Sequence, residues 1–114
     1  MRKLYIVKNS RDFEKIITTG KIIKNKSFVV YSIENNLPYS RFGISVGKKI
    51  GNAVNRNKYK RRLRNIIDKY KKDYINSKAY IIILRGSAKD KTYQELETDF
   101  LSLIDKMRKE KQND

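Results

Sequence analysis

The strongest candidate for chemistry in this chain is a dense run of cationic side chains near its middle. The seventeen residues from Lys48 to Arg64 include eight lysines and arginines, and no acid occurs from Asn35 through Ile67. Such a density needs a counter-charge, which a polyanion or an anionic membrane surface can provide. The cations are Lys48, Lys49, Arg56, Lys58, Lys60, Arg61, Arg62 and Arg64.

The spacing within this run predicts a helix that begins near Ala53, with Asn52 as the N-cap. One stripe of the helix is apolar, the next is polar and basic, and a third basic stripe lies further round. One face can therefore pack on a core while the other two present donors to solvent or phosphate. The three stripes are Tyr59, Leu63, Ile66, Ile67 and Tyr70; then Asn57, Lys60, Arg61 and Arg64; then Lys58, Arg62 and Lys69.

Three interpretations of this helix are open. A solvated charged face is the commonest, but the run has no acids to form i,i+4 ion pairs. A membrane-surface helix is the second, and its apolar stripe would have neither Trp nor Phe. Charge and pattern together favour nucleic-acid binding, the third.

Catalytic groups are scarce. The chain has no His and no Cys, which excludes the usual nucleophilic triads and thiolate metal sites. The best carboxylate pair is Glu95 and Asp99, but Glu95 fits a capping box with Thr92, and we expect Asp99 to be solvent-exposed. The segment from Gly43 to Lys48 is one residue short of a phosphate loop. We therefore expect a binding protein without catalytic or metal-ligating side chains.

The totals indicate one small domain spanning residues 1–114. Twenty-eight lysines and arginines against twelve acids give a net charge of +16. No segment has the roughly 18 apolar residues that a membrane span needs, and the N-terminal apolar run is too short for a signal peptide. We expect a cytoplasmic protein with no membrane partner and a frayed tail over about 110–114.

The remaining pattern predicts an α+β fold in the order helix, strand, strand, basic helix, strand, helix. The first two strands are expected to form a hairpin, and the third to be buried on both faces of a mixed sheet. Ser10 is the expected cap of the first helix and Gly20 its C′ residue. The expected elements are a helix over 10–19, strands over 27–33, 41–46 and 79–84, and a last helix opening at Thr92.

The segment from Ser45 to Arg64, SVGKKIGNAVNRNKYKRRLR, closely resembles the signature of the bacterial ribonuclease P protein component family. That family's "RNR" motif corresponds to Arg56, Asn57, Lys60, Arg61 and Arg64. The resemblance extends over essentially the whole chain, including the pair Asp12–Phe13, the strand Phe28–Tyr31 and the run from Thr92 to Glu95.

This resemblance implies a fold with an unusual left-handed βαβ crossover and a protein that works with a large catalytic RNA. Together they would remove the 5′ leader of precursor tRNA, with hydrolysis performed by the RNA and by Mg²⁺ held by RNA and substrate. One protein per RNA is expected. By the same resemblance, the RNA-binding residues are Lys48, Lys49, Arg56, Asn57, Lys60, Arg61 and Arg64, and a cleft for the single-stranded leader contains Phe13, Ile17, Tyr31 and Ser45.

Other functions fit the composition too. A stand-alone basic RNA-binding or ribosomal protein is the main alternative, because it needs only the basic helix. A helix-in-groove DNA binder needs a short helix and a tight turn before the recognition helix, whereas strands and glycines precede this one.

Overall fold

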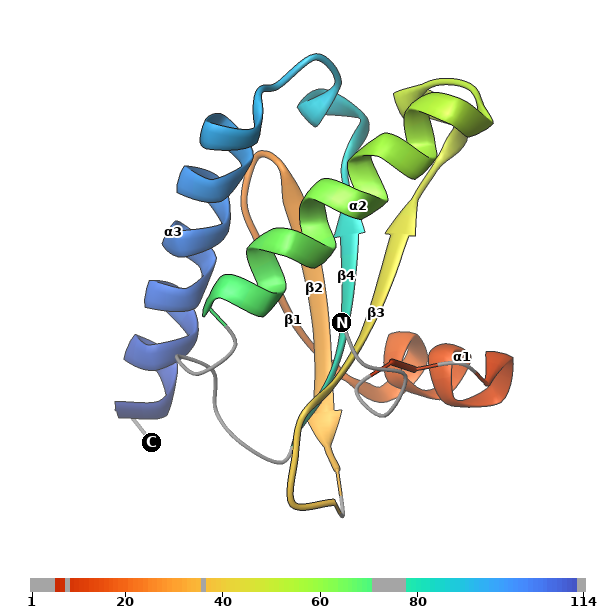
Figure 1. The fold of residues 1–114 in the computed structure, drawn as a ribbon. Coiled ribbons are helices and arrows are strands. Elements are labelled where there is room, and N and C mark those ends of the chain that lie inside the picture. The colour runs from red at the N-terminus through yellow and green to blue at the C-terminus, as the bar shows by residue number, and fades with distance from the viewer. Residues whose placement is uncertain (1–5, 8, 36, 71–77, 113–114) are drawn as a thin grey trace.

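A computed structural model describes residues 6–7, 9–35, 37–70 and 78–112. Four strands form one mixed sheet in the order β1-β2-β4-β3; α1 crosses one face, and α2 and α3 cover the other (Figure 1). This arrangement confirms the α+β class. None of the described helices is long and apolar enough to cross a membrane. The elements are α1 (Ser10–Thr19), β1 (Lys21–Lys24), β2 (Phe28–Glu34), β3 (Arg41–Val46), the 3-10 helix η2 (Lys48–Ile50), α2 (Ala53–Tyr70), β4 (Lys78–Leu84), the 3-10 helix η4 (Gly86–Ala88) and α3 (Tyr93–Gln112).

The strand pairing differs from the expected hairpin in two ways. The predicted order omitted β1, a four-residue strand bounded by lysines, which pairs antiparallel with β2. The expected pairing of β2 with β3 was wrong, because β4 lies between them, antiparallel to β2 and parallel to β3. An almost wholly apolar strand is most stable in the centre of a sheet, where both of its faces are covered.

The connection from β3 through α2 to β4 is a left-handed crossover. In Figure 1 the parallel strands β3 and β4 both point upward, β4 lies to the left of β3, and α2, which connects them, lies in front of the sheet. Nearly all βαβ units have the opposite hand. The family resemblance had implied this exception.

The main core lies between the sheet and the helices α2 and α3. The predicted apolar stripe of α2 supplies Tyr59, Leu63, Ile66 and Ile67, all buried. Aromatic rings reinforce the contact, as in the edge-to-face pair of Phe28 and Phe100 at 5.7 Å. This apolar stripe is therefore part of the core, so only the other faces of α2 can contact a binding partner.

The first helix starts and ends differently from the prediction. Its N-cap is Asn9, not Ser10: the Asn9 side chain accepts a hydrogen bond from the Arg11 N–H at 2.9 Å. Gly20 ends the helix in an extended conformation, with φ −75°. A Cβ on Gly20 would lie 2.5 Å from the Ile16 carbonyl oxygen and 2.9 Å from that of Ser32. Glycine is therefore needed here for the close approach of two backbone segments, not for a left-handed turn.

The last helix opens with the predicted capping box. The Thr92 N–H donates to Glu95 Oε1 at 3.0 Å, and the Glu95 N–H donates to Thr92 Oγ1 at 3.2 Å. These bonds hold the pKa of Glu95 below its usual range. The helix continues to Gln112. The frayed tail expected over about 110–114 stays a prediction, and residues 113–114 lie outside the described residues.

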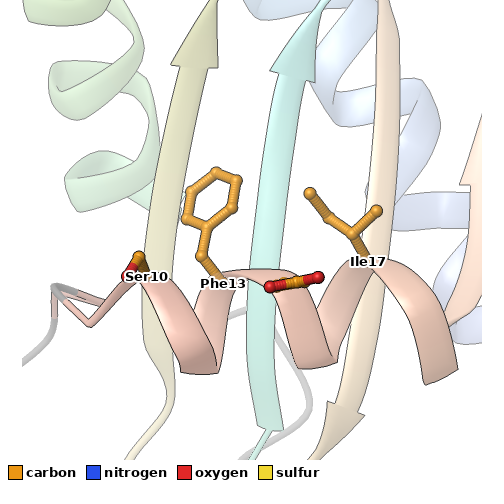
Figure 2. Close-up of a pocket in the computed structure, with 4 residues that line it drawn as sticks. Ser10, Phe13 and Ile17 are labelled. Carbon is orange, nitrogen blue, oxygen red and sulfur yellow. The ribbon is translucent and has the colours of Figure 1, made fainter.

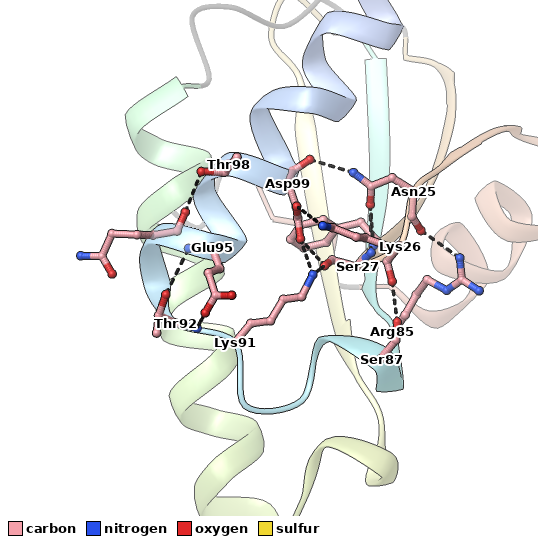
Figure 3. A network of polar contacts seen from close by, with 12 residues as sticks. Asn25, Lys26, Ser27, Arg85, Ser87, Lys91, Thr92, Glu95, Thr98 and Asp99 are labelled. Atoms are coloured by element: carbon pink, nitrogen blue, oxygen red, sulfur yellow. Dashed lines mark hydrogen bonds and ion pairs between the residues drawn. The ribbon is translucent and has the colours of Figure 1, made fainter.

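The expectation that Asp99 is exposed was wrong. Asp99 is buried and accepts from Ser27 Oγ and from Lys91 Nζ, the latter at 2.6 Å (Figure 3). Burial opposes its ionisation, but donation from Lys91 and Ser27 outweighs that cost and lowers the pKa of Asp99. This network joins α3 to the β1–β2 turn, where Asn25 Nδ2 donates to the Asp99 carbonyl at 2.8 Å.

Candidate nucleic-acid interface

The second stripe of α2 is presented to solvent. Asn52 caps the helix as predicted, accepting from the Asn55 N–H at 3.0 Å. Asn57, Arg61 and Arg64 are exposed, and Lys60 is half-buried. Within the described residues, the cations of this stripe have no intramolecular hydrogen bond or ion pair. They are therefore available to an external anion, and their role in binding RNA stays a prediction.

Two of the three cations of the third stripe make internal contacts, in contrast to the prediction, and only Lys58 is exposed without a partner in the part of the chain that the structure describes. The Arg62 guanidinium lies 5.5 Å from the centre of the Tyr59 ring and donates to the Lys91 carbonyl at 3.5 Å. Lys69 pairs with Glu97 of α3 at 2.8 Å. Arg62 and Lys69 thus fasten α2 to α3 and to the segment that precedes it.

Glu97 collects two donors at that junction. Besides Lys69, the Tyr70 hydroxyl donates to the same Glu97 oxygen at 2.9 Å. The Glu97 hydrogen bond raises the pKa of both Lys69 and Tyr70, and their donation lowers the pKa of Glu97. Lys69 is therefore held by α3, whereas Lys58 stays exposed with no partner among the described residues and adds one cation beside the neighbouring stripe.

Arg56 lies between the stripe and the core. It is half-buried, and its Nε is inaccessible and has no hydrogen-bond partner in the described part of the chain. Its backbone N–H donates to the Asn52 carbonyl at 2.9 Å, as expected for the first turn. Of the predicted RNA-binding cations on α2, Arg56 and Lys60 are half-buried, whereas Arg61 and Arg64 are exposed.

The approach to α2 adds two exposed cations, Lys48 and Lys49 of η2. Gly51 then turns the chain into α2 with φ +145°, a conformation that side-chain-bearing residues rarely adopt. The Lys49 stem lies over η4, because a Cβ on Gly86 would be 3.2 Å from Lys49 Cβ. Packing of η2 against η4 therefore fixes the position of these two cations relative to the sheet.

A separate apolar site lies on the opposite face of the sheet. Along α1, Ser10, Phe13, Glu14 and Ile17 line a pocket of about 430 Å³ (Figure 2). Figure 2 shows Phe13 and Ile17 projecting from α1 along the part of the sheet that the helix leaves uncovered. Phe13, Ile17 and Tyr31 are all half-buried against one cluster, whose buried members are Val7, Ile16, Ala79 and Ile81.

Three of the four predicted cleft residues thus share one apolar cluster, and Ser45 lies on the same side of the sheet. Ser45 pairs in register with Ile83, and Gly43, two residues earlier, pairs with Ile81. Ser45 is half-buried and lies at the end of β3 that leads to η2. The predicted cleft and the predicted basic surface therefore meet at this end of β3.

Two residues that were not among the predicted site residues also shape the cleft. A Cβ on Gly43 would lie 2.7 Å from Ile81 Cδ1 and 3.0 Å from Phe13 Cε2, so glycine makes room for the aromatic ring. Arg41 forms an ion pair with Asp12 at 3.6 Å, which ties α1 to β3. The alternation of small and polar residues on β3 was a signal for the first, but only the tertiary structure shows the second.

This arrangement can bind an anionic chain and hold unpaired bases. In the ranges that the structure describes, no three acidic side chains gather as a metal site. Free guanidinium and ammonium groups neutralise phosphates, and the apolar cleft with its aromatic rings suits base faces.

Comparison with known proteins gives a consistent result. A family model described as ribonuclease P matches residues 1–108. The ribonuclease P protein component of Streptococcus thermophilus is 36% identical over 104 residues, which cover 91% of this chain and 93% of that protein. A structure of the Staphylococcus aureus RNase P protein is 39% identical, covers 89% of this chain and 93% of its own, and superposes with a TM-score of 0.81. The structure of the RNase P protein from Thermotoga maritima is 31% identical, covers 86% of this chain and 93% of its own, and superposes with a TM-score of 0.78.

Proposed function

The chain belongs to the ribonuclease P protein family, and we propose from this membership that it binds the catalytic RNA of ribonuclease P and the 5′ leader of precursor tRNA. It would thereby assist endonucleolytic removal of the leader, as one component of an endoribonuclease. One protein would bind one RNA, in the cytoplasm. The alternative, a stand-alone basic RNA-binding or ribosomal protein, needs no cleft.

The observation that carries this proposal is the pairing of two unlike surfaces on one small sheet. The side chains of Asn57, Lys60, Arg61 and Arg64 have no internal partner among the described residues, and this stripe suits a folded RNA backbone. Arginine adds planar, bidentate phosphate contacts, and Asn57 can both donate and accept at a sugar or base edge. The cleft with Phe13 and Tyr31 suits single-stranded nucleotides instead, since stacking on an aromatic face does not depend on sequence.

Catalysis in this proposal belongs to the RNA. The protein would act by holding substrate and RNA together. Mg²⁺ would be bound by the catalytic RNA and by the substrate phosphates, where it can activate water and stabilise the leaving oxygen. The cations of η2 and α2 would reduce the repulsion between the two RNA molecules and so lower the Mg²⁺ concentration needed for cleavage.

The test is cleavage of precursor tRNA by a catalytic RNA at low Mg²⁺, with and without the protein. We expect the protein to restore leader removal and to be inert alone. Failure to stimulate several bacterial catalytic RNAs, with RNA binding retained, would favour the stand-alone RNA-binding alternative.

A further inference from the structure

The face of the sheet that carries the cleft continues past it to the outer strand, β1. The register aligns Ile22 with Tyr31, which in turn aligns with Ile81. It likewise aligns Lys24 with Val29 and Val29 with Ile83, the partner of Ser45. Directly paired residues point to the same side of a sheet. Two rows of side chains therefore cross the whole sheet on the α1 side, and Ile22 and Lys24 are their outer ends.

These outer ends differ from the middle of the rows in exposure. Ile22 is 55% exposed, whereas Val29, Tyr31 and Ile83 are half-buried. Lys24 is exposed, and its ammonium group has no partner among the described residues, although its carbonyl accepts from Lys106 Nζ at 3.1 Å. Neither row contains an acid. An exposed apolar side chain beside a free cation can receive a base face and the adjoining phosphate.

We propose that Ile22 and Lys24 form a distal subsite for the 5′ leader, beyond the predicted cleft. This inference rests on the proposed function. Lys48 and Lys49 of η2 and Arg56 in the first turn of α2 follow β3 directly, at the β3 end of the rows. The leader would therefore enter there from the catalytic RNA, and its nucleotides furthest from the cleavage site would reach β1. The two outer strands are three inter-strand spacings apart, about 14 Å, so a leader must exceed a minimum length to reach the subsite.

A lysine on an edge strand has another role, which is to prevent pairing with other chains. Lys21, at the other end of β1, separates the two roles. It is exposed like Lys24, but its register partner is Ser32, so it points to the α2 and α3 side of the sheet. Lys21→Ala therefore removes the same charge from the same strand without touching the leader face.

The experiment measures the affinity of the reconstituted holoenzyme for precursor tRNAs whose leaders are shortened one nucleotide at a time. We expect Lys24→Ala to weaken binding of long-leader substrates about three- to tenfold and to reduce the slope of log affinity against log salt by about 0.7, the value for one single-strand phosphate. Ile22→Ser should weaken binding of the same substrates, and Lys21→Ala should match the parent protein. All variants should bind the shortest leaders equally.

Equal behaviour of Lys24→Ala and Lys21→Ala at every leader length would overturn the subsite, while normal stimulation of cleavage by both would leave the proposed function intact. A loss by Lys24→Ala that is the same for short and long leaders would also overturn it. Absence of any stimulation by the parent protein would refute both proposals together. Thermal melts of the three variants check that each is folded, and a photoreactive nucleotide placed at the distal leader position of the parent complex should cross-link to β1.

Discussion

Two adjacent arginines of α2 give the sharpest test of the division between binding and structural cations. Arg61 is exposed and has no internal partner among the described residues, whereas Arg62 contacts Tyr59 and the Lys91 carbonyl. Arg61→Ala and Arg62→Ala remove the same charge from neighbouring positions of one helix. We expect the first to weaken RNA binding and the second to weaken folding.

The structure gives the size of each effect. The contact of Arg62 with the Tyr59 ring is worth about 0.5–1 kcal/mol, and its hydrogen bond, long at 3.5 Å, adds about 0.5 kcal/mol. The loss of about 1–1.5 kcal/mol lowers Tm by roughly 5 °C for a chain of this size. Arg61 has no such contacts, so its removal should change the free energy of unfolding by less than about 0.5 kcal/mol.

RNA binding should show the reverse order. If Arg61 contacts one phosphate of the catalytic RNA, Arg61→Ala reduces the slope of log affinity against log salt by about 0.9. Arg62→Ala should leave that slope unchanged, because its guanidinium is held against the protein.

The assays are thermal unfolding of each variant and binding of the catalytic RNA across a salt series. Arg64→Ala serves as a second member of the binding class, since Arg64 is exposed on the same stripe. Equal losses of Tm and affinity in Arg61→Ala and Arg62→Ala would refute the reasoning, because the stripe would then be structural throughout.

Three further predictions concern the cleft and the fold. Tyr31→Ala should weaken binding of leader-bearing precursor about tenfold, as expected for the roughly 1–3 kcal/mol of one stacked base; the same loss with leaderless tRNA would remove Tyr31 from the cleft. Gly20→Ala should destabilise the protein by about 1–3 kcal/mol in urea unfolding, because the new Cβ meets two backbone oxygens; an unchanged midpoint would mean that the backbone yields there. The pKa of Asp99 is lowered in the folded protein, so its carboxylate stabilises the fold above the unfolded pKa of about 3.9 and loses that contribution as pH falls through the lower folded value. The free energy of unfolding should therefore fall more steeply below about pH 4 in the parent protein than in Asp99→Asn. Parallel curves of unfolding free energy against pH would contradict the role of the ion pair with Lys91.

The features that could be predicted from the sequence are those set by local chemistry. The period of the apolar residues in α2 placed Tyr59, Leu63 and Ile66 on its buried side, and Asn52 and the Thr92 box marked two helix starts. Each of these signals lies within a few residues of the feature it specifies, and here tertiary packing agrees with it.

The features that were missed depend on segments far apart in the chain. Four residues bounded by lysines, as in β1, are too short to show alternation, and only pairing with β2 makes them a strand. Asp99 looked like a surface acid, because Ser27 and Lys91 approach it only in the folded protein. Arg62 could not be told from Arg61 by sequence, since the difference is a contact with a segment about thirty residues away.

The central position of β4 has a consequence for how this protein is made. β4 follows β1, β2, β3 and α2 along the chain, yet it separates β2 from β3 and underlies both α1 and α2. Pairing across such long loops costs chain entropy before the contacts repay it. A nascent chain that has emerged from the ribosome up to the end of α2 already contains every cation of the basic run. It still lacks β4, so the sheet on which α2 packs cannot yet form and orient those cations. Residues 77–114, the last third of the sequence, contain eight of the 28 lysines and arginines but also seven of the twelve acids, for a net charge of only +1. We therefore expect this nearly neutral third to decide when the molecule can bind its proposed RNA partner.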